Sequence, residues 1–120
     1  MIITFYDSTG LPIAYSDNNM DIFLFSGQPV AYVSGESIYS FKGTHLGRFR
    51  SGWIRDNNGA CVFFTSAATG GPMKPMKSMK PMKGMKSMKP MKGMKSMKPM
   101  RPMNNRSWST LSGEKFFFQA

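Results

Sequence analysis

The chain of 120 residues has few of the side chains on which most enzymes and metal sites depend. It contains one cysteine, one histidine and six acidic residues. A single cysteine, Cys61, excludes an intrachain disulfide and a cysteine-based metal cluster, and we expect it to be a small buried apolar residue. The sequence has no phosphate loop, no zinc-ligand spacing and no paired-carboxylate motif. We therefore expect a protein that is not an enzyme and that has neither a metal site nor a cofactor.

His45 and Cys61 are the one conceivable nucleophilic pair, because a thiol nucleophile needs a base within hydrogen-bond reach. In the sheet predicted below, Asp7 and Asp56 lie near turns on the same face, where they could line a small polar rim with Ser40 and Cys61. One cysteine and one histidine often coincide by chance, so we interpret both as structural residues.

Long apolar runs are also missing. No stretch approaches the roughly 20 apolar residues that cross a bilayer. The opening segment, MIITFYDSTG, lacks the basic start and the continuous apolar run of a signal peptide. We expect a cytoplasmic protein. The alternative is a peripheral protein on the inner face of the membrane.

Acidic residues are absent from one long segment, residues 72–103, which holds nine lysines and Arg101. That segment carries a charge of +10, and the whole chain also carries +10. Residues 1–71, with four basic and five acidic residues, carry −1, and residues 104–120 carry +1. A near-neutral domain with one basic arm is typical of a protein that uses the arm to attach itself to something.

The first seventy residues contain an internal fourfold repeat, marked by glycines 17, 16 and 16 residues apart. The four aligned segments are FYDSTGLPIAY, IFLFSGQPVAY, IYSFKGTHLGR and IRDNNGACVFF. Each resembles a β-hairpin, because a two-residue turn candidate ending in Gly10, Gly27, Gly43 or Gly59 is flanked by β-branched and aromatic residues. Eight up-and-down strands are predicted, at residues 2–8, 11–17, 20–25, 28–33, 36–41, 44–50, 53–57 and 60–65.

The turns fix a register in which large residues face small ones across each hairpin. On one face Phe5 lies opposite Ala14, Ile22 opposite Ala31, and Ile38 opposite Gly47, as a narrow closed interior requires, whereas Ile54 opposite Phe63 departs from the rule. The other face is predicted to pair Tyr6 with Ile13, Phe23 with Val30, Tyr39 with Leu46, and Trp53 with Phe64. Both faces are apolar, so the second must be covered by the C-terminal tail, by another copy or by a membrane.

With the repeat laid out, the sequence resembles the four-fold β-flower family of small bacterial domains. The resemblance is carried by YDSTGLPIAY (Tyr6–Tyr15), LFSGQPVAY (Leu24–Tyr32), HLGRFRSGWIRDNNG (His45–Gly59) and GGPMKP (Gly70–Pro75), and weakly by SWS (Ser107–Ser109). It implies an all-β fold, in which hairpins stand like petals around a pseudo-fourfold axis and form a shallow barrel-like cup. It implies no reaction and no catalytic residues.

Residues 72–103 repeat the triplet Pro/Ser/Gly-Met-Lys, ending with Arg101 and Asn104. A period of three matches polyproline II, with about 3.1 Å per residue, so methionines and cations would lie on separate edges of a segment roughly 100 Å long. A collagen helix would need glycine at every third position, where this segment has two. The competing interpretation is a disordered low-complexity linker.

We interpret the triplet segment as a membrane-binding tail, because methionine adapts to apolar surfaces while lysine pairs with anionic head groups. Nucleic acid is the second candidate partner, although no aromatic residue accompanies the cations. Cuprous ion is the third, opposed by the lysines. The predicted binding residues are Lys74, Lys77, Lys80, Lys83, Lys86, Lys89, Lys92, Lys95, Lys98, Arg101, Met73, Met76, Met79, Met82, Met85, Met88, Met91, Met94, Met97 and Met100.

Residues 104–120 form an aromatic C-terminal segment with Trp108 and the run Phe116–Phe118. Free aromatics of this kind promote aggregation, so we expect them to pack back on the flower, with insertion into the same interface as the methionines as the alternative. The sequence as a whole predicts a noncatalytic module that attaches to anionic membranes through residues 72–103. The alternatives are a nucleic-acid-associated protein and a homo-oligomer formed through the outer apolar face.

Overall fold

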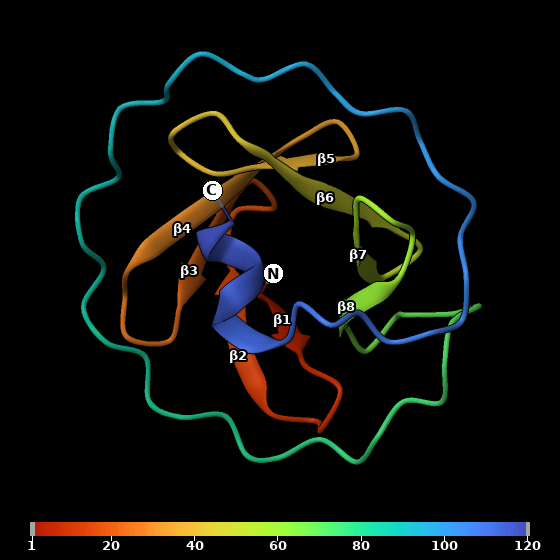
Figure 1. Cartoon of the computed structure of the whole chain (residues 1–120). Coiled ribbons are helices and arrows are strands. Elements are labelled where there is room, and N and C mark those ends of the chain that lie inside the picture. The colour runs from red at the N-terminus through yellow and green to blue at the C-terminus, as the bar shows by residue number, and fades with distance from the viewer. Residues whose placement is uncertain (1, 120) are drawn as a thin grey trace.

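The computed structural model describes residues 2–119. Its eight strands form a closed antiparallel barrel, in which each strand pairs with the next in the chain (Figure 1). The barrel closes where Tyr6 pairs with Phe64. All eight predicted strands are present within one or two residues, so the predicted all-β flower is confirmed. The strands are β1 (Ile3–Tyr6), β2 (Pro12–Ser16), β3 (Asp21–Leu24), β4 (Pro29–Ser34), β5 (Ser37–Tyr39), β6 (His45–Arg50), β7 (Trp53–Asp56) and β8 (Cys61–Phe64).

The hairpins β1–β2, β3–β4, β5–β6 and β7–β8 are the four petals. The predicted register of the inner face is confirmed in each of them. Small residues opposite large ones allow the strands to close around a narrow interior. The observed pairs are Phe5 with Ala14, Ile22 with Ala31, Ile38 with Gly47 and Ile54 with Phe63.

The turns differ from the prediction by one residue. In the first petal the Gly10 amide donates to the Asp7 carbonyl at 2.9 Å, and the Asp7 amide donates to the Leu11 carbonyl at 3.0 Å. The loop therefore has three residues, with Gly10 at a φ of 84° as its last. The expected two-residue turns are wrong, because a three-residue loop that ends in a left-handed glycine also reverses the chain.

Three residues after each turn glycine, a β-bulge restores the predicted register. The expected outer pairs of Tyr6, Phe23 and Tyr39 are therefore wrong, and these residues lie opposite Pro12, Pro29 and His45. The extra residue of each bulge lies in or against the inner core, as does the residue that follows it in the chain. In an unbroken strand two successive side chains point to opposite faces, so only the bulge allows both to face inward. These extra residues are Ile13, Val30, Leu46 and Val62.

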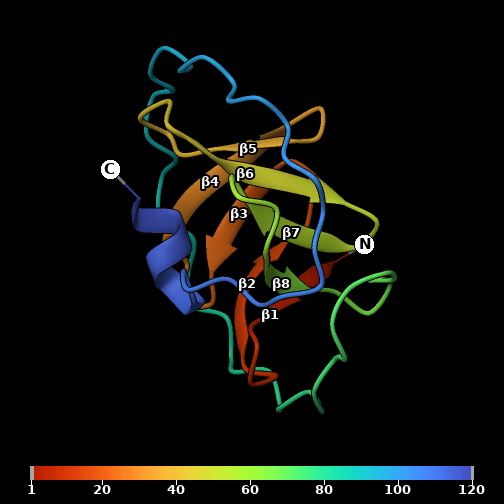
Figure 2. The same cartoon turned by 45° about the vertical axis from the view of Figure 1, so that its right-hand side comes forward.

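The C-terminal segment closes one end of the barrel through the 3₁₀ helix η1 (Gly113–Phe118) (Figure 2). Phe116 and Phe117 are buried and contact Phe63, with ring centroids 5.7 and 5.4 Å apart. Phe118 is exposed. The inner core, which the strands leave open at this end, is therefore completed by residues more than fifty positions away from β8 in the chain.

The outer face of the barrel is buried as well. Neighbouring petals meet through stacked aromatic pairs, with ring centroids 5.3 to 5.9 Å apart and planes inclined by 23° to 25°. The stacked pairs are Tyr6 with Phe64, Tyr15 with Phe23, and Tyr32 with Tyr39.

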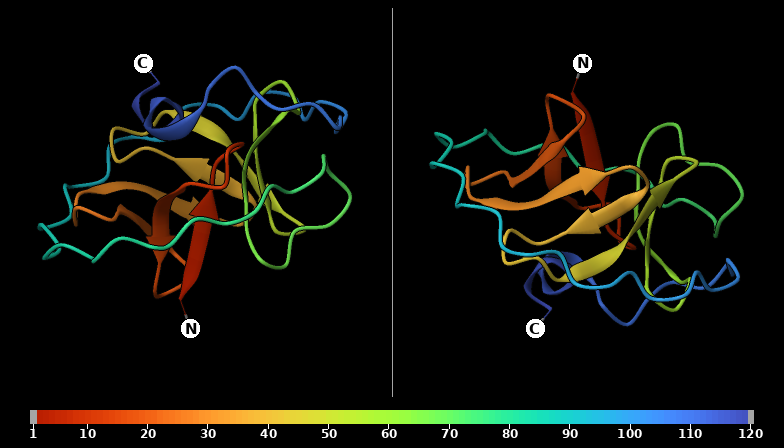
Figure 3. Two further views of the ribbon diagram at one scale, coloured as in Figure 1. Left: turned by 90° about the horizontal axis from the view of Figure 1, so that it is seen from below. Right: turned by 90° about the horizontal axis from the view of Figure 1, so that it is seen from above.

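Residues 72–105, called the girdle below, cover this face by circling the barrel once between its two ends (Figures 1 and 3). Residues 73–103 form neither helix nor strand. The molecule measures 36 × 36 × 23 Å. A circle 36 Å across has a perimeter of about 113 Å, close to the length of about 105 Å that the thirty-four girdle residues span at about 3.1 Å per residue. The girdle is therefore a nearly fully stretched chain.

Removing the Phe116 ring should destabilise the barrel strongly, because that ring fills the open end of the core. We expect Phe116→Ala to lower the free energy of unfolding by about 3–5 kcal/mol. Phe118→Ala, which alters an exposed ring on the same helix, should cost less than about 0.5 kcal/mol. Guanidinium denaturation of both variants measures the difference, and equal losses would show that η1 does not plug the barrel.

Candidate functional site

The girdle is bound to the tips of the petals at regular intervals of nine residues. Each tip glycine carbonyl accepts a hydrogen bond from a girdle amide, at 2.7 to 3.2 Å. These bonds need only backbone groups on both sides, so they do not depend on any girdle side chain. The donors and acceptors are Ser78 to Gly10, Ser87 to Gly27, Ser96 to Gly43, and Asn105 to Gly59.

The nine-residue interval is also present in the sequence. Residues 81–89 and 90–98 are identical, and residues 72–80 differ from them at one position, Pro75. This longer period was not predicted from the triplets. Its signal is the residue before each methionine and the residue that ends the pattern, which run in the order Pro, then Gly or Pro, then Ser or Asn. Nine girdle residues therefore correspond to one petal, as the spacing of the four anchors requires.

The tip glycines have two separate reasons to lack a side chain. Gly43 has a φ of 102°, which favours glycine. A Cβ on Gly43 would also lie 2.0 Å from the Met94 carbonyl oxygen, so the girdle backbone occupies the place of a side chain. The same close approach is found at the other three tips.

Five of the nine girdle lysines lie over the outer aromatic pairs of the barrel. The ammonium groups of Lys83 and Lys86 lie 4.8 and 4.7 Å from the ring centroids of Tyr15 and Phe23. A cation over an aromatic face contributes about 0.5–1 kcal/mol at an exposed site. Equivalent contacts join Lys77 to Tyr6, Lys92 to Tyr32 and Lys95 to Tyr39.

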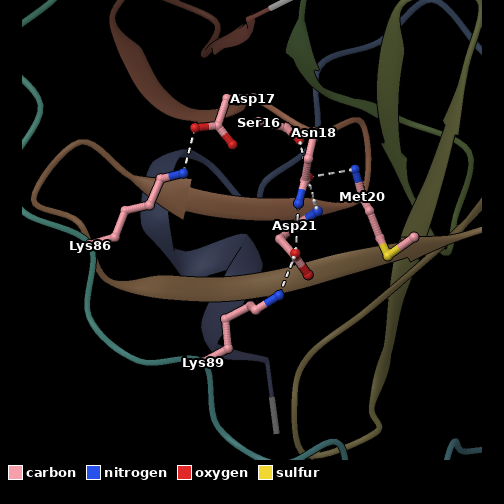
Figure 4. Close-up of polar contacts among 7 residues, drawn as sticks. All are labelled: Ser16, Asp17, Asn18, Met20, Asp21, Lys86 and Lys89. Atoms are coloured by element: carbon pink, nitrogen blue, oxygen red, sulfur yellow. Dashed lines mark hydrogen bonds and ion pairs between the residues drawn. The ribbon is translucent and has the colours of Figure 1, made fainter.

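Two lysines also pair with acids between the first and second petals, one in the loop after β2 and one at the start of β3 (Figure 4). Lys86 forms an ion pair with Asp17, and Lys89 Nζ lies 2.8 Å from Asp21 Oδ2. Burial alone would raise the pKa of Asp21, but hydrogen bonds from Lys89 and Asn18 outweigh it and hold that pKa below its ordinary value. The girdle is thereby fixed to the acidic side chains of a near-neutral barrel.

At the junction of the third and fourth petals an arginine pair, Arg48 and Arg55, replaces the aromatic pair. The buried Arg55 donates to the carbonyls of Gly70, two residues before the girdle, and of Asn105, its last residue, and so joins the two ends of the circle. Arg48 donates to the Pro99 carbonyl at 2.7 Å. The change from aromatic rings to guanidinium groups thus coincides with the place where the circle closes.

Nearby, Arg101 Nη1 lies 3.4 Å from Glu36 Oε1. Lys74 donates to the Ala68 carbonyl at 3.0 Å. Eight of the ten predicted cations therefore contact the barrel or the loops beside it, and most of them lie against it rather than projecting freely.

The methionines of the girdle, called the rim below, point the opposite way and cover the circumference of the molecule. Their exposed fractions range from 90% to 95%, which means that their side chains touch almost nothing. The rim includes Met103 besides the ten predicted methionines. Its members are Met73, Met76, Met79, Met82, Met85, Met88, Met91, Met94, Met97, Met100 and Met103.

His45 and Cys61 have different surroundings. The ring nitrogens of His45 lie 2.9 Å from Asn57 Oδ1 and 3.0 Å from Ser37 Oγ, and burial lowers the pKa of this imidazole. Cys61 packs in a second apolar cluster with Trp53 and its neighbours, where burial raises the pKa of the thiol. Each residue is held by its own structural contacts.

Asp7 and Asp56, which the sequence suggested as part of a small polar site with Ser40 and Cys61, stabilise turns instead. Asp7 accepts the amides of Thr9 and Leu11, and Asp56 accepts the amides of Asn58 and Ala60. Within residues 2–119 no group of three or more His, Cys, Asp or Glu side chains is placed to hold a metal ion. In the same residues no helix is both long and apolar enough to cross a bilayer.

The close approach at the tips predicts a difference between two glycines with positive φ. Gly43→Ala should cost the roughly 1–2 kcal/mol of a left-handed alanine and, in addition, the girdle contact at that tip. Gly35→Ala is the control, because Gly35 has a φ of 64° but no atom within 4 Å of its Cβ position. Urea denaturation should show the larger loss for Gly43→Ala, and equal losses would contradict the anchor.

The lowered pKa of Asp21 predicts a pH dependence of stability. A carboxyl that holds its proton more weakly when folded stabilises the fold fully above its unfolded pKa, and this contribution is lost as the pH falls through the folded value. Asp21→Asn should cost about 1–3 kcal/mol at pH 7 and flatten the stability profile below pH 4. Asp17→Asn, at a more exposed ion pair, is the control with a smaller effect. An unchanged acid profile in Asp21→Asn would contradict the assignment.

The comparisons with known proteins agree with this architecture. The family model described as 4-fold beta flower protein matches residues 3–117. No curated protein and no solved structure matches the chain. The matched range spans the girdle and most of η1 as well as the petals, and reaches well beyond the residues that carried the resemblance in the sequence. With eight strands in four petals and a match over nearly its whole length, the chain belongs to the 4-fold beta flower family.

Proposed function

We propose that this protein is a noncatalytic attachment module that binds anionic membrane surfaces through its girdle. The observation that carries the proposal is the rim, in which eleven methionine side chains are 90–95% exposed with a cation beside nearly every one. Exposed apolar groups of this number are unusual on a protein surface and mark an interaction site. Flexible thioethers beside cations suit the boundary between acyl chains and anionic head groups.

The shape of the molecule defines how such a contact would form. The rim follows the circumference of a disc measuring 36 × 36 × 23 Å, so a flat bilayer meets one arc at a time, with the disc edge-on. Each full nine-residue repeat of the girdle offers three methionines and three lysines. With about 1 kcal/mol for each cation near an anionic leaflet, repeat 90–98, whose lysines form no ion pair with the barrel, contributes at most about 3 kcal/mol. Repeat 81–89 contributes less, because Lys86 and Lys89 are paired with Asp17 and Asp21. A single arc therefore supports weak, reversible binding.

The charge pattern favours lipid over nucleic acid. Five of the lysines lie over aromatic rings, which are thereby covered and are not free to stack on bases. Single-stranded nucleic acids are bound through such stacking platforms. The outward groups are thioethers, which a phosphate backbone does not need.

Two further candidates have less support. The outer aromatic face, suggested as a contact between copies, is occupied by the chain's own girdle. Cuprous ion would need several thioethers together. Successive rim methionines are about 9 Å apart along an extended chain and point outward, so they do not converge.

Vesicle flotation tests the proposal. The native chain should float with vesicles that contain phosphatidylserine and remain behind with neutral vesicles, at 150 mM salt. A variant with all eleven rim methionines changed to serine should lose most of this binding while melting at the native temperature, because the side chains removed have no contacts.

A variant with the rim methionines changed to leucine is the matched control and should retain binding. If the serine variant binds anionic vesicles and heparin as well as the native chain does, the methionines have no role. The membrane proposal would then be wrong.

A further inference from the structure

The sulfur atoms of the rim are exposed together, which gives the surface a chemical property that burial normally denies to methionine. All eleven rim side chains are at least 90% exposed. A thioether in solution is oxidised to the sulfoxide by two-electron oxidants, and the sulfoxide is polar where the thioether was apolar. The whole circumference of the molecule can therefore change polarity by one reaction.

The other sulfur and indole side chains in the described part of the chain are all less exposed than the rim. Cys61 and Trp53 have exposed fractions of 0% and 1%. The raised pKa of Cys61 keeps its sulfur in the less reactive thiol form. Met20, outside the girdle, is about half exposed. Oxidation is thus directed to the rim by geometry.

The girdle holds its place without any contribution from the methionine side chains. Its anchors are amide-to-carbonyl bonds such as Ser87 to Gly27, and lysine contacts such as Lys89 to Asp21. Methionine oxidation usually damages a protein because it places a polar sulfoxide in a packed core. Here the oxygen would be added on the solvent side, where it displaces nothing.

We propose that the rim is a site of reversible methionine oxidation, at which peroxides convert an apolar circumference into a polar one while the fold stays intact. With hydrogen peroxide, the sulfur lone pair attacks one oxygen and forms the S–O bond as the O–O bond breaks. The sulfur loses two electrons, the peroxide is reduced, and the proton of the transferred oxygen ends in the water that leaves. Methionine sulfoxide reductases, which take electrons from thiols, restore the thioether.

A consequence for attachment rests on the membrane function proposed above. Sulfoxides enter the acyl region poorly, so an oxidised rim should leave the membrane with only the lysines to hold it. We expect about a tenfold or greater loss of affinity for anionic vesicles, with the remaining binding strongly dependent on salt. Peroxide would thereby release the protein from the surface without unfolding it.

The test exposes the full chain to hydrogen peroxide and follows each methionine by peptide mass mapping, with thermal melting and vesicle flotation on the same samples. The rim methionines should react at one uniform rate, equal to that of a free peptide of residues 81–98, and the melting temperature should stay unchanged. Slower or uneven oxidation along the rim, or unfolding in step with it, would overturn the proposal.

Two variants separate this proposal from the membrane function. The rim Met→Leu variant cannot be oxidised and should float equally well before and after peroxide, whereas a rim Met→Gln variant should behave like the oxidised chain from the start. Treatment of the oxidised native chain with sulfoxide reductases should restore both mass and flotation. If the untreated chain does not float, the membrane function fails, while the oxidation rates and the melting temperature still decide the oxidation proposal.

Discussion

Four hydrogen bonds from girdle amides to the tip glycine carbonyls determine the rest of the structure. They require the distance between neighbouring petals to equal the length of nine extended residues. This equality makes the girdle a continuous circle whose ends meet at Arg55. The barrel thereby gains a cover for its outer aromatic face, which a domain of this size has no second core to bury.

A repeat of three residues gives each row of side chains its own direction. In an extended chain with three residues per turn, positions three apart share a face. Once the Pro/Ser/Gly row carries the anchors, the lysine row lies over the petals and the methionine row lies outside. The junction of Arg48 with Arg55 illustrates the same rule, because there the barrel supplies the cations and the girdle supplies the carbonyl oxygens of Pro99 and Asn105.

The petals could be predicted because their information is local. A glycine turn and its flanking strands are contained within some sixteen residues, which also set the pairs Phe5–Ala14 and Ile38–Gly47. The bulges were not predicted, since a three-residue loop and a two-residue turn both end in glycine. The girdle was missed for a different reason: its hydrogen-bonded partners lie up to 69 residues away, and only the match between two periods, nine and sixteen, indicates that it wraps. Viewed alone, ten cations in an acid-free segment suggest an arm that projects into solvent.

Amide hydrogen exchange measured by NMR tests the central claim most directly. The account predicts protection at every ninth girdle amide, at Ser78, Ser87, Ser96 and Asn105, together with Gly84 and Gly93, which donate to carbonyls of the second and third petals. The methionine and lysine amides between them, which have no backbone acceptor, should exchange at the rate of an unstructured peptide. Uniform fast exchange from residue 72 to residue 105 would show that the segment is a free tail and that the circle does not exist.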